Sequence, residues 1–463
     1  LSFAFLIPGL PFRGDTLHRQ SLGGSEPAAI CLARELVRLG DICRVFTGDE
    51  GEPQYYNGVQ YLPIRLFTNF GPRVPHDVTV VQRYPEVLSV RQESKLTVLW
   101  CHDQALRRDV DRYRSVLWNI DKVAVLSRFM HDAYRDVYEI PERHLWLTRN
   151  GVDLTEFETA RQRHVSGPGQ RDPKLLLYGA RPERGLDVML RDIMPRLLER
   201  DRDLKLLVCT YDNPVPQLEA FYAECHQLAA KLGPNVVRFL GGLKRADLYD
   251  LHRQVGVYVY PTPSPMMPTF HEISCISAME CMASSLPVVA TDRGALAETL
   301  APGAGTLIPG TSADAGYVSA FVDAVMAYVN DPVLASRAGE AGRAAAQKLS
   351  WSEVAHGWHD MCVDEIVARN ESPERMIRHF VRRGDMIAAK ELITLNEAAA
   401  NEPGKPIHVE AMLRTSQIPT TEPHTLPKPV IEVIQSTLEK IAPNEPILWW
   451  GIGSRPLLLG IKD

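Results

Sequence analysis

The sequence lacks the features that mark membrane-spanning and nucleic-acid-binding proteins. None of its apolar stretches reaches the eighteen residues that a transmembrane helix requires. The formal net charge is only −6 over 463 residues, and so modest a charge disfavours a general nucleic-acid binder. The apolar N-terminal stretch follows no basic residues, unlike a secretory signal peptide. We therefore expect no membrane span.

Cysteine is also scarce, and its spacing argues against a metal site. The chain has eight cysteines, and no two of them form a C-x-x-C pair, so a structural zinc site is not expected. Most lie within apolar stretches, as buried free thiols do in a reducing compartment. We find no Asp-x-Asp loop that we assign to a metal. These features predict a cytoplasmic protein without metal ligands.

What the sequence does contain is a regular alternation of short apolar stretches with helical patterns. Largely apolar strands suit parallel sheets that helices cover on both faces, and alternation with helices indicates doubly wound α/β units. Two such sets predict two Rossmann-like domains. The expected strands are residues 3–7, 42–47, 78–82, 96–101, 123–126 and 144–147 in the first set, and 175–178, 204–209, 236–239, 257–260, 286–290 and 305–308 in the second.

The most informative segment contains two glutamates eight residues apart, Glu272 and Glu280. A helix is expected over residues 276–283, and eight residues span a little over two helical turns, so both carboxylates could face one side. The helix N-terminus between them would present amides to phosphates. Such a pair could bind both ends of a sugar nucleotide. An amphipathic helix with two solvated carboxylates is an equal alternative for this motif alone.

Four other motifs accompany the glutamate pair. They are residues 23–26 (Gly-Gly-Ser-Glu), residues 150–153 (Asn-Gly-Val-Asp) with Phe157, residues 179–185 (Gly-Ala-Arg-Pro-Glu-Arg-Gly), and residues 286–291 (Leu-Pro-Val-Val-Ala-Thr) with Glu298. In this order, and over residues 1 to about 370, the five motifs resemble those of retaining GT-B glycosyltransferases of family 4, which carry an E-x7-E signature. The resemblance implies the GT-B fold, in which two Rossmann-like domains face a cleft.

The resemblance implies a role in donor binding for each residue of the signature. Glu280 would accept hydrogen bonds from the ribose hydroxyls of a nucleotide sugar. Glu272 would contact hydroxyls of the donor sugar. The backbone amides of Cys275, Ile276 and Ser277 would bind the diphosphate at the helix start.

The other motifs supply groups around the same ligand. Arg181 and Arg184 follow a strand end, and guanidinium groups make bidentate, permanently charged phosphate contacts. Gly23 and Gly24 permit close backbone approach at a helix N-terminus, near the diphosphate and acceptor of the resembled family. His102 follows an apolar strand and matches the family's cleft histidine, which lies near the transferred sugar.

The sequence departs from the family pattern at two places. Ser274-Cys275 stands where the family has Phe-Gly, and Ser284-Ser285 stands where it has Cys-Gly before the next strand. The first change adds a Cβ atom close to the expected diphosphate. We interpret both changes as variation within a subfamily.

The resemblance predicts a retaining, metal-independent transferase that moves a hexose from a nucleotide sugar, UDP- or GDP-linked, to an acceptor. No further cofactor is implied. Catalysis would rest on positioning and on stabilising the leaving diphosphate, which acts as the base. The acceptor class is open: a glycan, lipid, protein, nucleic acid or small molecule. Two alternatives remain, namely a GT-B sugar-nucleotide epimerase and a non-catalytic glycosyltransferase-like binding module.

The expected domain order follows from these assignments. Residues 1–165 would form the N-terminal acceptor domain, completed by a crossing helix over residues 352–370, and residues 166–351 the donor domain. Residues 371–415 read as a helical extension. Residues 416–463 read as a proline-rich linker and a terminal segment.

The terminal segment ends in a strand-and-glycine pattern that is typical of the start of a Rossmann-like domain, with only a few residues after it. The chain also begins with leucine. Both features lead us to expect a fragment of a longer protein, with a further domain or partner at the C-terminus. A terminal strand that packs locally is the alternative.

Three connecting segments have expected roles. Residues 160–173 contain little apolar content and read as the hinge between the domains. Residues 53–61 and 67–75 read as variable loops of the first domain, where acceptor pockets of the resembled family lie.

Overall fold

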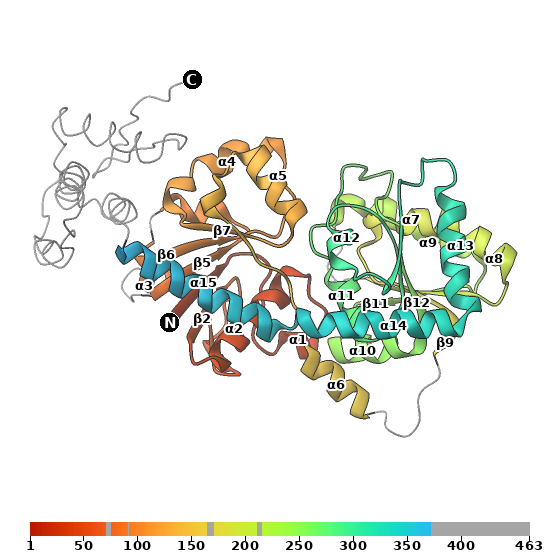
Figure 1. Cartoon of the computed structure of the whole chain (residues 1–463), viewed down its shortest axis with the longest axis horizontal. Coiled ribbons are helices and arrows are strands. Elements are labelled where there is room, and N and C mark those ends of the chain that lie inside the picture. The colour runs from red at the N-terminus through yellow and green to blue at the C-terminus, as the bar shows by residue number, and fades with distance from the viewer. Residues whose placement is uncertain (71–75, 91, 164–170, 211–214, 372–463) are drawn as a thin grey trace, which may run out of the picture.

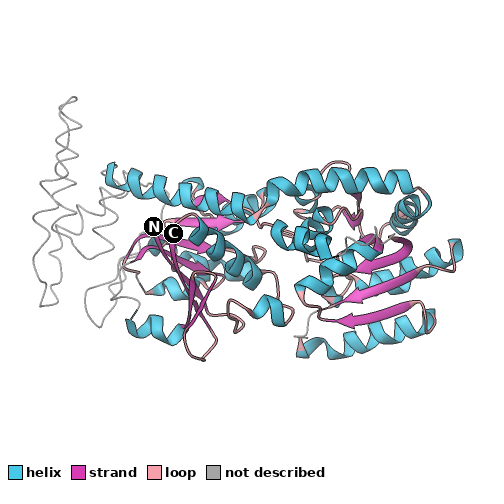
Figure 2. Cartoon of the chain, turned by 90° about the horizontal axis from the view of Figure 1, so that it is seen from below, coloured by secondary structure: helices cyan, strands magenta, loops and turns pink. Residues whose placement is uncertain are grey.

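The computed structural model describes residues 1–70, 76–90, 92–163, 171–210 and 215–371. Figure 1 shows two α/β lobes side by side, with the strands of residues 2–147 in one lobe and those of residues 172–308 in the other. In Figure 2 the strands of each lobe lie between helices. The predicted extension and terminal segment, residues 372–463, lie outside the described residues.

The first lobe contains an eight-stranded sheet in the order β3-β4-β2-β1-β5-β6-β7-β8. All its pairings are parallel except β3 with β4. Its strands are β1 (Ser2–Ile7), β2 (Ile42–Thr47), β3 (Gln54–Tyr56), β4 (Val59–Pro63), β5 (His76–Gln82), β6 (Ser94–Trp100), β7 (Lys122–Val125) and β8 (Leu145–Leu147). Its helices are α1 (Thr16–Arg19), α2 (Ser25–Arg38), α3 (Ile64–Phe70), α4 (Val110–Arg114) and α5 (Arg128–Tyr138). Helix α6 (Leu154–Arg163) packs on the second lobe, where Phe157 stacks on Tyr249.

The second lobe contains a six-stranded, fully parallel sheet in the order β11-β10-β9-β12-β13-β14. Its strands are β9 (Asp172–Tyr178), β10 (Lys205–Cys209), β11 (Val237–Gly241), β12 (Val255–Tyr260), β13 (Val288–Thr291) and β14 (Gly305–Ile308). Its helices are α7 (Leu186–Val188), α8 (Met194–Arg200), α9 (Glu219–Leu232), α10 (Arg245–Gln254), α11 (Ile276–Ala283), α12 (Leu296–Thr299), α13 (Tyr317–Asn330) and α14 (Pro332–Ala346). The two doubly wound domains confirm the predicted fold class.

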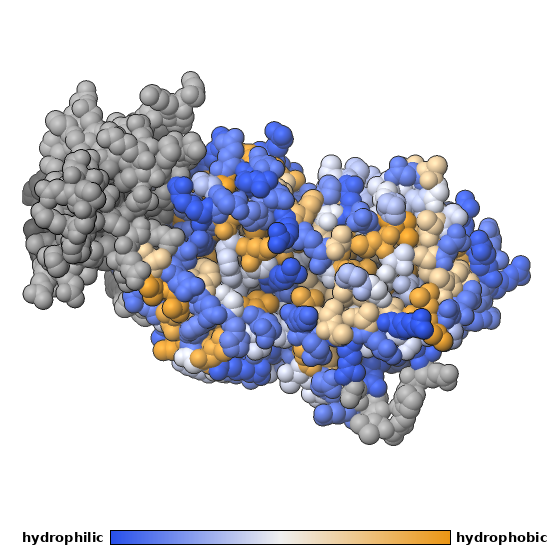
Figure 3. Space-filling model, viewed as in Figure 1, coloured by the Kyte–Doolittle hydropathy of each residue, from blue (hydrophilic) through white to orange (hydrophobic). Residues whose placement is uncertain are grey.

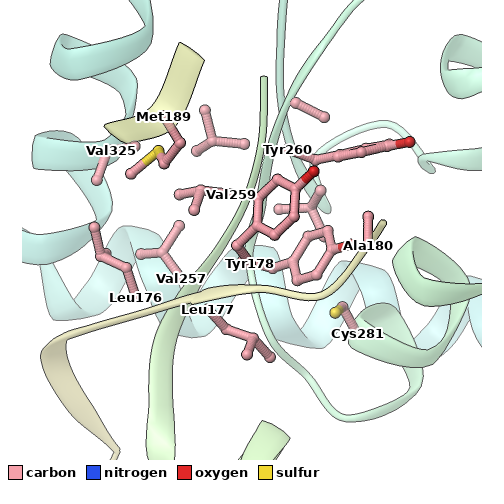
Figure 4. Close-up of a cluster of buried hydrophobic side chains, with 14 of the residues drawn as sticks. Leu176, Leu177, Tyr178, Ala180, Met189, Val257, Val259, Tyr260, Cys281 and Val325 are labelled. Carbon is pink, nitrogen blue, oxygen red and sulfur yellow. The ribbon is translucent and has the colours of Figure 1, made fainter. Parts of the chain in front are cut away.

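The core of the second lobe shows why its strands are apolar throughout. The side chains of Leu176 and Val257, from neighbouring strands β9 and β12, are fully buried and lie toward Met189 and Val325 on one face of the sheet (Figure 4). Cys281 of α11 is buried on the other face. Helices cover both faces, so no strand of the sheet's centre keeps a polar side.

Residues 53–61 do not form the predicted loop. They contain β3, a turn and the first part of β4, an antiparallel hairpin at the edge of the first sheet. Asn57 and Gly58 form the turn with φ of 50° and 79°, and an Asn-Gly pair suits such a turn because both residues tolerate positive φ. This dipeptide is the signal that identifies the hairpin. The other predicted loop begins in α3, and residues 71–75 lie outside the described residues.

The predicted hinge is shorter than expected. Helix α6 continues to Arg163 and β9 begins at Asp172, so both ends of residues 160–173 belong to regular elements. Residues 164–170 lie outside the described residues. The stretch therefore contains the end of a helix and the start of a strand as well as a connection.

Helix α15 (Trp351–Glu371) returns from the second lobe to the first, as Figure 1 shows for the blue helix. Trp358 is fully buried, and its ring centre lies 5.2 Å from that of Trp100 and 5.0 Å from that of Trp146. Ala355 and Cys362 are also fully buried in the core of the first lobe. The C-terminal helix of the described chain thus completes the N-terminal domain.

Replacing Trp358 by alanine is expected to lower the free energy of unfolding by about 3–5 kcal/mol, because the change leaves a large cavity beside the rings of Trp100 and Trp146. Urea denaturation of the wild type and the variant measures the difference. Replacing the exposed Val367 of the same helix by alanine is the matched control and should change stability by less than about 0.5 kcal/mol. Equal losses from both variants would contradict the assignment of α15 to the core.

All eight cysteines are free and buried, as predicted. Among the described residues, no single helix is long and apolar enough to cross a membrane. Residues 317–330 and 332–349, two helices joined at a sharp bend, are long and apolar enough only when taken together. The face of the molecule in Figure 3 is hydrophilic over most of its outer edge.

Candidate active site

Three adjoining cavities lie where the two domains meet. The central cavity has a volume of about 230 Å³ and is lined by both domains. An inner cavity shares Gly24, Gly179, Tyr258, Ile276 and Ser277 with it. An outer cavity of about 480 Å³ lies on its other side. The residues that follow β1, β5, β6, β9 and β12 line the central cavity, and the carboxyl ends of parallel strands are where doubly wound domains bind ligands.

Glu272 lies in the loop before α11, at the central and outer cavities. Its side chain is buried and accepts a hydrogen bond from the Tyr260 hydroxyl at 3.0 Å and from the Ile273 amide at 3.1 Å. The Nη1 atom of Arg184 lies 3.8 Å from its Oε2 atom. As predicted, Glu272 stands before the start of the helix, which begins at Ile276, and Glu280 lies within it.

Glu280 lies within α11 and lines the inner cavity. It is buried, accepts a hydrogen bond from the Tyr249 hydroxyl at 2.9 Å, and lies 3.8 Å from the Arg245 guanidinium. Burial raises its pKa, while Arg245 and the Tyr249 hydroxyl act in the opposite direction. Both glutamates are therefore held inside the interdomain space, which excludes the alternative of two solvated carboxylates.

The start of α11 lies between the two carboxylates. Its first amides have no acceptor within the helix, and no side chain caps them. Cys275, Ile276 and Ser277 line the central cavity, as does Ser274, whose buried hydroxyl has no hydrogen-bond partner among the described residues. Cys275 also belongs to the buried core of the second domain, so the side chain that replaces the family's glycine packs into that core.

Gly23 and Gly24 approach this helix start from the first domain. Gly24 is the residue before α2, and a Cβ atom on it would lie 3.4 Å from Cδ1 of Ile276. A Cβ atom on Gly23 would lie 3.3 Å from Oε2 of Glu26, a buried carboxylate that lines the central cavity. Gly24 thus lies against Ile276 of the second domain, whereas Gly23 faces Glu26 of its own domain.

Arg181 and Arg184 enter the central cavity from a short turn after β9. Gly185 closes the turn with φ of 122°, and a Cβ atom there would lie only 2.0 Å from the Pro261 carbonyl oxygen. The guanidinium carbon of Arg184 lies 4.9 Å from the ring centre of Phe270. Both arginines keep part of their surface exposed, 23% and 35% of the side chain, so they can reach a ligand.

His102 lines both the central and outer cavities. Its Nε2 atom lies 3.0 Å from Nε2 of Gln82, which also donates to the Ser25 carbonyl oxygen at 2.9 Å. Since that carbonyl only accepts, the Gln82 atom is the amide nitrogen, and His102 Nε2 must accept its second hydrogen. The ring proton is then on Nδ1. Burial and the nearby Arg83 lower the pKa of His102 to about 3, although the Asp103 carboxylate acts to raise it. The ring is therefore neutral at pH 7.

Several residues of this site were missed by the sequence analysis. Gln82 and Arg83 follow β5, and Arg83 makes a bidentate ion pair with Asp103 at 2.9 and 2.8 Å. Arg245 lies across the domain boundary, 3.5 Å from the sulfur of Cys31. Polar residues directly after a predicted strand are a signal that could have found Arg83, whereas Arg245 carries no such signal.

No group of three or more His, Cys, Asp or Glu side chains in the described part of the chain is arranged to hold a metal ion. The positive charges at the central cavity come from Arg83, Arg181 and Arg184. Arginine can neutralise phosphate charge without a metal.

Three histidines with strongly lowered pKa values predict a loss of stability in mild acid. Burial lowers the pKa of His102 and His252 to about 3 and that of His76 to about 4, below the value of about 6.5 in the unfolded chain. Between pH 6.5 and 4 the unfolded chain binds more protons, so the free energy of unfolding falls as pH falls. His76→Gln should reduce this slope by at most about 1.4 kcal/mol per pH unit, the value for a difference of one proton. Urea denaturation at pH 7 and pH 5 measures the slope, and equal stability at both would contradict this account.

Comparisons with known proteins agree with this geometry. Residues 172–331 match the family described as Glycosyl transferases group 1. Phosphatidyl-myo-inositol mannosyltransferase of Mycobacterium tuberculosis (strain ATCC 25618 / H37Rv) is 30% identical over 223 residues, which cover 48% of this chain and 52% of that protein. Alpha-maltose-1-phosphate synthase of the same strain is 28% identical over 248 residues, covering 50% and 60%. The chain thus spans about half the length of the curated relatives it matches.

Solved structures of similar proteins cover more of the chain. Sucrose-phosphate synthase from Thermosynechococcus elongatus matches 80% of this chain and 100% of its own, with a TM-score of 0.61 and 18% identity. Anabaena Alr3699/HepE, solved in complex with UDP and glucose, matches 78% of this chain and 98% of its own, with a TM-score of 0.56 and 16% identity. At such identities the likeness shows the fold. Residues 172–331 therefore match the glycosyl transferases group 1 family, and the chain has the two-domain fold of the GT-B glycosyltransferases.

Proposed function

We propose that this protein is a retaining, metal-independent glycosyltransferase that moves a hexose from a UDP- or GDP-linked sugar to an acceptor. One observation carries the proposal. Two buried carboxylates, Glu272 and Glu280, lie in adjoining cavities on either side of an uncapped helix start and two arginines. That spacing of groups suits a ligand with hydroxyls at both ends and phosphates in the middle.

Each part of a nucleotide sugar then has a matching group. The ribose hydroxyls meet Glu280 in the inner cavity, and the diphosphate meets the amides at the start of α11. Arg181 and Arg184 face the diphosphate, where they stabilise the charge that grows as the sugar departs. The sugar lies in the central cavity, between Glu272 of the second domain and His102 of the first.

The state of His102 supports departure and attack on the same face of the sugar. Its Nε2 lone pair is engaged by Gln82 and its ring is neutral, with the proton on Nδ1. His102 therefore acts as a hydrogen-bond donor to the sugar or phosphate and does not remove a proton. The leaving phosphate oxygen then takes the proton of the acceptor hydroxyl, and the new bond forms on the face that the phosphate leaves.

The outer cavity is the proposed acceptor site. It shares Arg83, His102, Asp103, Arg184 and Glu272 with the central cavity, so an acceptor there reaches the sugar directly. Neither predicted acceptor loop contributes a described residue to the three cavities. In their place, the residues that follow β5, β6 and β12 form the site.

The names of the similar proteins support a sugar-nucleotide donor. The relatives include a mannosyltransferase and a D-inositol 3-phosphate glycosyltransferase, and the HepE protein was solved with UDP-glucose. These ligands belong to those proteins. They motivate the choice of UDP- and GDP-sugars as the first donors for this chain.

The test is incubation of the protein with a panel of UDP-, GDP- and ADP-sugars, followed by mass spectrometry for the free nucleotide and for hydrolysed or transferred sugar. The account expects consumption of a UDP- or GDP-sugar with release of the nucleoside diphosphate, and nuclear magnetic resonance should show that the sugar keeps its anomeric configuration. A changed sugar still attached to its nucleotide would indicate an epimerase. No nucleotide binding in calorimetry would indicate a non-catalytic binding module.

A further inference from the structure

Two loops that face each other across the outer cavity are hydrogen-bonded to one another. The Gln104 amide of the first domain donates to the Thr269 carbonyl oxygen at 3.3 Å, and its carbonyl oxygen accepts from the His271 amide at 3.0 Å. Gln104 is two residues after His102, and His271 is the residue before Glu272. One side chain therefore joins the histidine loop of the first domain to the glutamate loop of the second.

A second contact between the domains lies at the start of α5. The amides of Arg128 and Phe129 donate to the two carboxylate oxygens of Glu298, each at 2.7 Å. These amides belong to the first turn of the helix and have no acceptor within it, whereas the next amide, that of Met130, is capped locally by Ser127. Glu298 thus caps a helix of the other domain, and a carboxylate at a helix N-terminus is also favoured by the helix dipole.

Hydrogen bonds link each contact to the backbone at or beside a residue of the proposed sugar site. On the side of the second domain, the amide of Ala295 donates to the Glu272 carbonyl oxygen at 2.7 Å. Gly294 beside it has φ of 61°, and a Cβ atom there would lie 2.2 Å from that same oxygen. The segment that ends in Glu298 therefore supports the backbone of Glu272.

On the side of the first domain, α5 supports the histidine loop. The Tyr134 hydroxyl of α5 donates to the Asp103 carbonyl oxygen at 2.9 Å, between His102 and Gln104. The ring of Phe129, at the start of the same helix, stacks on that of His271 with centres 5.4 Å apart and planes at 25°. A connected path thus runs from Glu298 through α5 to His102, and another from Glu298 to Glu272.

We propose that Gln104 and Glu298 are positioning residues for the transfer, acting as an interdomain clamp made of Gln104, Phe129, His271 and Glu298. The clamp holds Glu272 of one domain and His102 of the other at a fixed separation. It thereby sets the shape of the part of the central cavity where the sugar is proposed to bind. Neither Gln104 nor Glu298 lines the inner or central cavity, where the ribose and the diphosphate are proposed to bind. This inference rests on the proposed function for its role in transfer, while the contacts themselves can be tested without activity.

The clamp predicts a separation of binding from turnover. Glu298→Ala and Gln104→Leu should each lower kcat for the nucleotide sugar that the wild type consumes by about tenfold to hundredfold, because misplacement of catalytic groups by about 1 Å has effects of that size. The affinity for UDP and GDP, measured by calorimetry, should change by less than about twofold, because the groups proposed to bind ribose and diphosphate remain. Gln104→Glu keeps the acceptor for His271 and should retain more activity than Gln104→Leu.

Asp331→Ala is the matched control. The Asp331 carboxylate also accepts from two amides at a helix start, those of Val333 and Leu334 at 2.9 and 3.0 Å, but within one domain. Its removal should lower the thermal midpoint without changing kcat. A loss of kcat in Asp331→Ala equal to that in Glu298→Ala would mean that lost stability explains the effect, and would overturn the clamp.

Amide hydrogen exchange tests the contacts directly. The amides of residues 128 and 129 should be protected from exchange in the wild type and in Asp331→Ala. In Glu298→Ala they should exchange faster, while the amide of Met130, which Ser127 caps, should exchange at the wild-type rate. Equal exchange in wild type and Glu298→Ala overturns the clamp, as does full kcat in both clamp variants of an active enzyme. A wild type that consumes no nucleotide sugar overturns the proposed function, and with it the clamp's role in transfer, so the two failures are distinguishable.

Discussion

Replacing Arg184 by alanine is expected to lower kcat for donor turnover by about 10²–10³-fold while KM changes much less. The Arg184 guanidinium faces the central cavity beside Glu272 and over Phe270. The diphosphate gains charge as the sugar departs, so a cation at this place binds the transition state more tightly than the bound donor. Steady-state kinetics with the consumed nucleotide sugar measures both constants.

Two further variants make the prediction for Arg184 specific. Arg181→Ala should behave in the same way, and Arg184→Lys should retain part of the activity because it keeps the charge and loses the bidentate geometry. Arg191→Ala is the control, since Arg191 pairs with Glu224 at 2.8 Å outside the three cavities. An effect of Arg184→Ala confined to KM would show that the arginine only holds the ground state.

Glu280→Gln is expected to weaken the binding of UDP or GDP by about 1–3 kcal/mol, the cost of losing charged hydrogen bonds to ribose hydroxyls. Glutamine keeps an acceptor for the Tyr249 hydroxyl, which donates to Glu280 in the native protein. It is therefore gentler than alanine, which would leave the buried Tyr249 hydroxyl without its acceptor. Titration calorimetry measures the affinity, and the thermal midpoint checks the fold.

Glu224→Gln provides the comparison for Glu280. Glu224 lies in the same domain on α9 and lines none of the three cavities. Nucleotide affinity should be unchanged in this variant. Unchanged affinity in Glu280→Gln as well would remove the ribose from the inner cavity and would require a different orientation of the donor.

The fold could be read from the sequence because its strands are buried on both faces. Residues 42–47 and 305–308 are predicted with the bounds that β2 and β14 have in the structure, and α11 is found over the predicted residues 276–283. The hairpin of β3 and β4 was missed because both strands are short and contain polar residues, and β3 lies at the edge of the sheet. Edge strands carry a weaker apolar signal than central ones.

The candidate site could be read only in part. Its residues were predicted from motifs, and the structure brings Glu272, His102 and Arg184 to one cavity. The placement of Glu272 before the helix and of Glu280 within it followed from the predicted start of that helix. The hydrogen bonds of Gln82 and Tyr260 depend on how the sheets place distant strands, which no local pattern contains.

The binding position of the nucleotide is the most direct test of this account. A crystal structure of the full chain with UDP or GDP should place the ribose beside Glu280 and the diphosphate between the amides of residues 275–277 and Arg184. Density for the nucleotide outside the interdomain cavities, or a ribose without contact to Glu280, would contradict the account. So would a protein that binds neither nucleotide at millimolar concentration.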